Sequence, residues 1–134
     1  DALQGSGLAD HPEVDVREYI YDMPLVMAAA DLVLCRAGAS TIAEIAAIAK
    51  PAVLVPSPNV VADHQTKNAE FLVREGAAHL LPQKSTGAAD LAAQLSEVLM
   101  HPETLTRMAA RARSLAKPEA TRTVVDACLE VARG

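Results

Sequence analysis

The chain has 134 residues, enough to bury one hydrophobic core, so a single domain is expected. About half of the residues are hydrophobic (51%) and few are aromatic (2%), which excludes a disordered chain and predicts an aliphatic core. The net charge of −5 comes without a basic run and argues against nucleic acid as the main partner. It does not exclude a small anionic ligand, because the amides at the start of a helix bind phosphate without a net positive charge.

In chain order, glycine and proline in residues 1–13 predict a loop or frayed start, and residues 14–134 are assigned to one domain. The β propensity of Val14, Val16 and Tyr19 predicts a strand at residues 14–20, and short, mainly apolar runs predict three more at 31–35, 52–56 and 78–81. Helical spacing, prolines and caps predict helices at residues 24–30, 40–50 and 64–75, across 91–99, from Pro102, and from Ala120. In the last helix one side is lined by Ala120, Val124, Cys128 and Val131.

Alternation of strands with helices predicts an α/β fold, a Rossmann-like parallel sheet with helices on both faces. Continuous apolar strands fit a sheet that is covered on both sides. In such sheets ligands bind beyond the carboxyl ends of the strands. Two polar clusters, one after Cys35 and one after Pro56, are expected at that edge.

The two cysteines, Cys35 and Cys128, lie in apolar surroundings and form no Cys-x-x-Cys pair, so we interpret both as buried thiols of a reducing compartment. No signal peptide is recognisable, and the apolar stretches are too short to span a membrane. These features predict a cytoplasmic domain and leave attachment to a membrane surface open.

The first polar cluster runs from Arg36 to Thr41. Gly38 allows a sharp turn and the close approach of a ligand. Ser40 or Thr41 is expected to cap the next helix, whose amides and dipole favour an anion. The alternative interpretation is an ordinary strand-to-helix turn with a good cap.

Glu44 lies in the first turns of the same predicted helix. Its carboxylate can accept hydrogen bonds from both hydroxyls of a ribose, because its two oxygens take two donors at once. The alternative is a capping box, since Glu44 stands three residues after Thr41.

The second polar cluster contains His64 and Gln65, which both donate and accept hydrogen bonds, as sugar hydroxyls require. The alternative is a polar helix start capped by Asp63. Two such clusters on one edge favour a nucleotide-activated sugar as the ligand. No metal-ligand spacing, Ser-His-Asp set or Walker loop is recognisable.

The ordered set Arg36-x-Gly38-x-x-Thr41-x-x-Glu44, Pro51, Pro56 and His64-Gln65-x-x-Asn68-Ala69 resembles the donor-binding half of the MurG family, the peptidoglycan N-acetylglucosaminyltransferases. The segments 18–23, 108–113 and 118–121 are also similar, so the resemblance covers roughly residues 14–133.

This resemblance implies the C-terminal half of a GT-B glycosyltransferase, with the first strands of that half missing. UDP-N-acetylglucosamine is the implied donor substrate, with no cofactor required and no metal cage. The implied binding residues are Ile20 through its backbone at the uracil, Arg36 and Gly38 in the motif, Ala39, Ser40 and Thr41 at the diphosphate, Glu44 at the ribose, and His64 and Gln65 at the sugar.

The implied reaction is an inverting transfer to the hydroxyl of undecaprenyl-linked lipid I, which yields lipid II. The catalytic residues and the acceptor site are expected on the missing amino-terminal domain. The full enzyme is expected to be peripheral on the inner face of the cell membrane. This piece alone is expected to bind the donor weakly and to transfer nothing.

Three alternatives stay open at this point. The chain is either part of another GT-B UDP-sugar transferase, the soluble half of a split dolichol-linked transferase, or a nucleotide-binding module without a transfer role. Arg36 and the His64-Gln65 pair favour the peptidoglycan enzyme over other UDP-sugar transferases.

Overall fold

A computed structural model describes residues 7, 10–60 and 63–133 of the chain. Its centre is a parallel sheet in the order β1-β2-β3, formed by Val33–Cys35, Ala52–Leu54 and Ala78–Leu80. The strands are in register, so that Leu34, Val53 and His79 stand side by side. The described helices are α1 Met23–Ala29, α2 Ala39–Ile48, α3 His64–Arg74, α4 Ala88–Leu99, α5 Pro102–Ser114 and α6 Ala120–Arg133.

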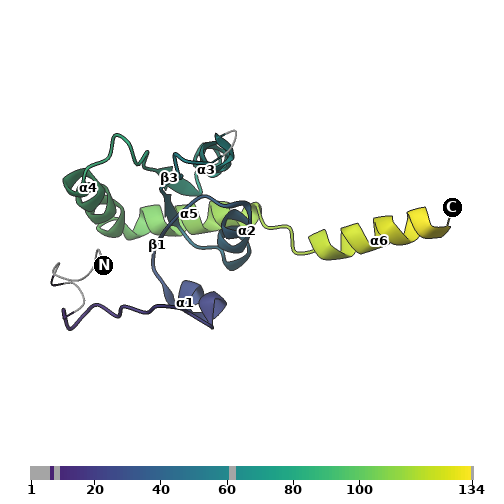
Figure 1. Cartoon of the computed structure of the whole chain (residues 1–134), viewed down its shortest axis with the longest axis horizontal. Helices are drawn as coiled ribbons and strands as arrows, with labels where there is room; N and C mark the ends of the chain where they lie inside the picture. The colour runs from purple at the N-terminus through teal and green to yellow at the C-terminus, as the bar shows by residue number, and fades with distance from the viewer. Residues whose placement is uncertain (1–6, 8–9, 61–62, 134) are drawn as a thin grey trace.

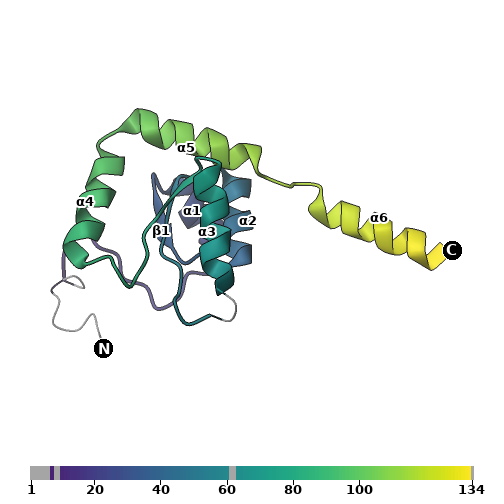
Figure 2. The same cartoon turned by 90° about the horizontal axis from the view of Figure 1, so that it is seen from above.

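Helix α2 connects β1 to β2 and helix α3 connects β2 to β3, so the sheet is built from two consecutive β-α-β units. Helices α2 and α3 lie side by side, and α5 runs across their ends (Figures 1 and 2). The core between them is aliphatic, as predicted, and its largest fully buried side chains include Ile45, Leu54 and Leu72. This arrangement places the N-termini of α2 and α3 at the same edge of the sheet.

The two ends of α3 lie where the sequence predicts them. Asp63 stands at the N-cap position but makes no capping hydrogen bond to the helix backbone; its Oδ1 accepts one from Thr66 Oγ1 at 2.6 Å. Gly76 follows the helix with a φ of 72°, in the left-handed region that glycine tolerates. The Ala77 amide donates to the Leu72 carbonyl at 2.8 Å, which closes the end of the helix. The chain is therefore turned directly into β3.

The predicted strand at residues 14–20 is wrong. This segment has no regular structure, and Val14 and Val16 are exposed. Their β propensity reflects packing on a pleated surface, and no described strand lies beside them to provide one. The predicted loop at residues 1–13 falls mostly outside the described residues, and the single domain at 14–134 stays a prediction.

Helix α6 forms where its periodicity predicts, but it extends away from the rest of the molecule (Figure 1). All of its residues are exposed, including Cys128. The prediction that both cysteines are buried is therefore wrong for Cys128, while Cys35 is half-buried. An apolar stripe predicts a helix but not the surface that covers it. Among the described helices, none is both long and apolar enough to cross a membrane.

Candidate functional site at the carboxyl edge of the sheet

The loops that follow β1 and β2 meet at the carboxyl edge of the sheet. Parallel pairing continues one step beyond the strands, because the Val55 amide donates to the Cys35 carbonyl at 2.9 Å. Residues 36–38 then lead into α2, and the segment after Val55 leads to α3. The two polar clusters of the sequence are thus brought to one edge.

Arg36 joins the loops at this edge. Its Nη1 donates to the carbonyl oxygens of Val55 at 3.0 Å and Pro56 at 3.4 Å. The same nitrogen donates to Oε1 of Gln83, beyond β3, at 2.6 Å. One guanidinium therefore contacts the segments that follow both β2 and β3, while its own backbone follows β1.

The first turn of α3 adds two more links. Oε1 of Gln65 accepts a hydrogen bond from the Ser57 amide at 2.9 Å, which holds the loop after β2 against the helix. Nδ2 of Asn68 donates to the Ala37 carbonyl at 3.1 Å, so α3 also contacts the loop after β1. Because a backbone amide only donates, the Ser57 contact fixes the orientation of the Gln65 amide, with its NH₂ group directed elsewhere.

Asn68 and Gln83 were not among the predicted binding residues, although both organise the edge. Asn68 stands three residues after Gln65, the spacing that puts two side chains on one helix face, and this was the available signal. Gln83 gave no local signal, because its partner Arg36 lies 47 residues away.

Helix α2 begins at Ala39, with Gly38 as its N-cap residue, so the prediction that Ser40 or Thr41 caps it is wrong. Ser40 and Thr41 instead lie inside the first turn. The first backbone bond of the helix runs from the Ile42 amide to the Gly38 carbonyl at 3.0 Å. The three amides before Ile42 have no acceptor within the helix, and Gly38 has no side chain to supply one. They are the part of the edge best suited to an anion.

Gly38 itself has φ −65° and ψ 152°, values open to any residue. The expectation that its freedom of conformation is needed for the turn is therefore wrong. A Cβ added there would meet Thr41 Oγ1 at 3.6 Å, which is ordinary contact. The close approach of a ligand at Gly38 stays a prediction, because an N-cap residue without a side chain leaves space over the first amides of α2.

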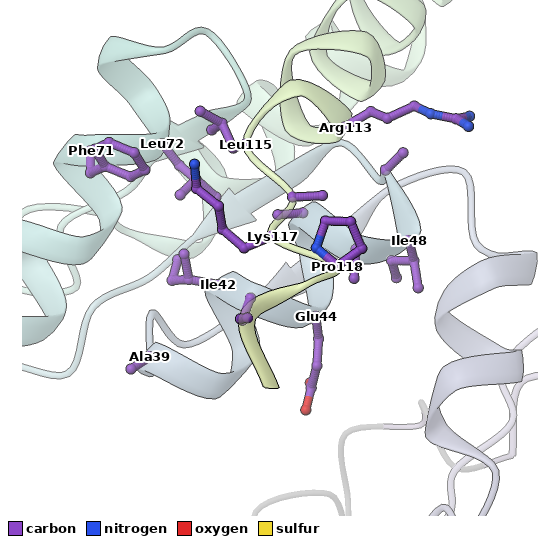
Figure 3. Close-up of a pocket in the computed structure, with 16 residues that line it drawn as sticks. Ala39, Ile42, Glu44, Ile48, Phe71, Leu72, Arg113, Leu115, Lys117 and Pro118 are labelled. Atoms are coloured by element: carbon purple, nitrogen blue, oxygen red, sulfur yellow. The ribbon is translucent and has the colours of Figure 1, made fainter. Parts of the chain in front are cut away.

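Glu44 is exposed on α2 and lines a cavity of about 990 Å³ together with Ala39. The cavity is mostly apolar and lies among α2, α3 and the segment that joins α5 to α6. The Glu44 side chain points away from Phe71 and Leu72 and from the other labelled side chains that line the cavity (Figure 3). The capping-box alternative for Glu44 is wrong, because Thr41 is the third residue of the helix and not its cap.

Cys35 lies close enough to Glu44 for the carboxylate to affect its thiol. Burial, and in second place the negative charge of Glu44, raise the pKa of Cys35 to about 11. The protonated thiol, the less nucleophilic form, is therefore favoured for Cys35 at neutral pH.

The remaining predicted residues lie apart from this cavity. Its described lining includes neither His64 nor Gln65, which stand at the first turn of α3. Ile20 is half-buried in the irregular segment before α1, between Tyr19 and Tyr21, whose rings lie edge to face with centroids 4.8 Å apart. Over the described residues, no group of three or more His, Cys, Asp or Glu could hold a metal ion.

The comparisons with known proteins agree with the fold. The family model of the glycosyltransferase family 28 C-terminal domain matches residues 2–124. The chain is 73% identical over 122 residues to a UDP-N-acetylglucosamine--N-acetylmuramyl-(pentapeptide) pyrophosphoryl-undecaprenol N-acetylglucosamine transferase of Pseudomonas paraeruginosa. It is 67% identical, also over 122 residues, to the protein of the same name from Azotobacter vinelandii. Each alignment covers 91% of this chain and 34% of the relative, so the chain spans about a third of the length of these relatives.

Among solved structures, the chain is similar to MurG of Acinetobacter baumannii, with a TM-score of 0.81 and 43% sequence identity. That alignment covers 87% of this chain and 35% of the other. A glycotransferase of kitacinnamycin aligns with a TM-score of 0.65 at 21% identity, which shows a shared fold alone. The predicted Rossmann-like α/β fold of the C-terminal half of a GT-B glycosyltransferase is thereby confirmed.

Proposed function

The chain belongs to the family of glycosyltransferase family 28 C-terminal domains, and we propose that it is the donor-binding part of a longer enzyme. In this proposal residues 14–134 bind UDP-N-acetylglucosamine, and the whole enzyme transfers N-acetylglucosamine to lipid I to make lipid II in peptidoglycan synthesis. The observation that carries the proposal is the set of hydrogen bonds that join the loops at the carboxyl edge of the sheet. There, hydrogen bonds from Arg36 to Val55 and from Asn68 to Ala37 hold the N-termini of α2 and α3 together.

The diphosphate is proposed to lie at the N-terminus of α2. The amides of Ala39, Ser40 and Thr41 have no acceptor within the helix, and the helix dipole adds to their attraction for an anion. Gly38 leaves the approach open because it carries no side chain. The guanidinium of Arg36, held at the same edge, adds a positive charge to the field around the diphosphate.

The nucleoside is proposed to lie along α2 and toward α1. Glu44 stands five residues after Ala39 on α2, about 7.5 Å along the helix axis, so a ribose at its carboxylate would lie next to a phosphate at the helix start. The uracil would then contact the backbone of Ile20, whose segment leads into α1, and α1 packs against α2.

The sugar is proposed to contact His64 and Gln65 at the start of α3. Because Oε1 of Gln65 is held by the Ser57 amide, its NH₂ group is what it offers to an oxygen of the sugar. The sugar would thus lie across the edge from the nucleoside, with the diphosphate between them.

In the proposed reaction the lipid I hydroxyl attacks the anomeric carbon and UDP leaves, with inversion at that carbon. Negative charge develops on the leaving diphosphate, so the amides of α2 would stabilise the transition state as well as the bound donor. We expect the catalytic base and the undecaprenyl-linked acceptor site on the part of the enzyme outside this chain. We also expect no required cofactor, and a peripheral position on the inner face of the cell membrane.

The test is calorimetric titration of UDP into the full-length enzyme and its Glu44→Ala variant. We expect the variant to bind UDP more weakly by about 1–3 kcal/mol, because charged hydrogen bonds to the ribose are lost. Glu70→Ala is the matched control, since it removes an exposed carboxylate from α3 outside the cavity and should leave the affinity unchanged. A Glu44→Ala enzyme that keeps its affinity for UDP would contradict the proposal.

A donor screen with the same enzyme tests the identity of the sugar. Tighter binding of UDP-N-acetylglucosamine than of UDP-glucose or UDP-galactose is expected. The reverse order would assign the chain to a transferase with another donor.

A further inference from the structure

Of the three hydrogen-bond acceptors of the Arg36 side chain, Gln83 lies farthest from Arg36 along the sequence. It stands three residues after β3, and its Oε1 accepts from Arg36 Nη1 at 2.6 Å, the shortest of the three contacts made by that nitrogen. A hydrogen bond to a charged donor is stronger than one between neutral groups. Gln83 therefore anchors the guanidinium in the position from which it contacts Val55 and Pro56.

These contacts lead to both halves of the proposed donor site. Arg36 is two residues before Gly38, the N-cap of α2. On the other side, Pro56 directly precedes Ser57, whose amide holds Gln65. A change in the position of the Arg36 side chain would thus shift the start of α2 relative to the first turn of α3.

We propose that Gln83 is a positioning residue for donor binding, which acts through Arg36 to hold the N-termini of α2 and α3 at the spacing of one donor molecule. This inference rests on the function proposed above. It assigns to a residue beyond β3 a part in a site whose ligand contacts come from α2 and α3.

The surroundings of Gln83 favour an effect on binding over an effect on folding. Both Gln83 and Arg36 are exposed, so neither contributes much to the hydrophobic core. A cavity of about 260 Å³ adjoins them, lined also by Val55, Leu81 and Gly87. If the Gln83 amide is removed, water can enter this space and compete for the guanidinium, and Arg36 gains other conformations.

The experiment compares variants of the full-length enzyme by calorimetric titration with UDP-N-acetylglucosamine and by steady-state kinetics. Gln83→Ala should raise the Kd and the KM for the donor roughly three- to tenfold, because one charge-assisted hydrogen bond at an exposed site is lost. The kcat should change less than the KM, since Gln83 does not touch the reacting atoms. Gln83→Met keeps the length of the side chain without its oxygen and should behave like Gln83→Ala.

Two further variants separate positioning from general disturbance of the loop. Gln83→Glu retains an oxygen acceptor for Arg36 and should keep the affinity within about twofold of the parent enzyme. Lys84→Ala is the matched control, because it removes the neighbouring exposed side chain of the same loop and should change nothing. In a double-mutant cycle, Gln83→Ala should add little to the loss caused by Arg36→Ala.

The positioning role is overturned if Gln83→Ala and Gln83→Met bind the donor as tightly as the parent enzyme, or if their effect simply adds to that of Arg36→Ala. It is also overturned if the parent enzyme itself fails to bind the donor, a result that would reject the proposed function with it. If Glu44→Ala weakens UDP binding while the Gln83 variants change nothing, the proposed function stands and only the role of Gln83 is rejected.

Discussion

Replacement of Gly38 by alanine should separate the ligand role of the first turn of α2 from its structural role. Gly38 has φ −65° and ψ 152°, and alanine adopts these values without strain. The added Cβ would lie 3.6 Å from Thr41 Oγ1, a side-chain atom of the turn whose amides are proposed to hold the diphosphate. The methyl group would therefore fit the fold and occupy space beside the proposed position of the ligand.

The expected change in stability is small because two effects oppose each other. Alanine is a poorer N-cap than glycine, which costs up to about 1 kcal/mol. It also restricts the unfolded chain, which stabilises the fold by about 0.4–1 kcal/mol. The free energy of unfolding should thus stay within about 1 kcal/mol of the parent value, while loss of one amide contact to a charged phosphate weakens UDP binding by about 1.5–3 kcal/mol.

The assay pairs urea unfolding with calorimetric titration of UDP into the same Gly38→Ala enzyme. Gly87→Ala serves as the control, because Gly87 is the N-cap of α4 with φ −79° and ψ 170°, and its added Cβ would also meet a side chain of its own first turn. The control should change stability as little as Gly38→Ala does and leave UDP affinity intact. Unchanged affinity in Gly38→Ala would refute the placement of the diphosphate over this turn.

Two other outcomes follow from the contacts of Gln65 and Cys35. Gln65→Glu keeps an acceptor for the Ser57 amide but loses the NH₂ group, so calorimetry should show weaker binding of UDP-N-acetylglucosamine, by about 0.5–1.5 kcal/mol, and unchanged binding of UDP. Equal losses for both ligands would count against a sugar contact. Iodoacetamide at pH 8 should alkylate the exposed Cys128 well before Cys35, whose pKa is raised to about 11, as measured by peptide mass spectrometry. Glu44→Gln should speed the reaction of Cys35, because a nearby negative charge is removed. Faster modification of Cys35 than of Cys128 would contradict the described burial.

The elements around the site were predictable because their signals are local. The runs at 52–54 and 78–80 are short and apolar except for His79, and glycine or proline separates them from helices of regular period. The start of α3 at His64 and the turn at Gly76 coincide with residue types, Asp63 and Gly76, that are common at helix ends. Local patterns of this kind also place the polar clusters at one edge, because parallel strands end on the same side.

The strand expected at 14–20 and the buried Cys128 failed for a shared physical reason. Each depends on a surface that the residue type cannot specify: a partner strand for Val16, and a covering face for α6. Propensity and periodicity report what an element would bury, and only the rest of the fold determines whether it is buried.

The cap of α2 shows the same limit at the scale of one turn. Ser40 and Thr41 are better N-cap residues than glycine by preference, yet the helix starts at Ala39 and leaves them inside it. The side chains that organise the edge make contacts over long sequence separations, since Asn68 reaches Ala37 and Gln83 reaches Arg36. Such contacts leave no periodic trace in the sequence. The residues most readily predicted are thus those proposed to touch the ligand, whereas the residues that set the distance between them emerge only from the folded chain.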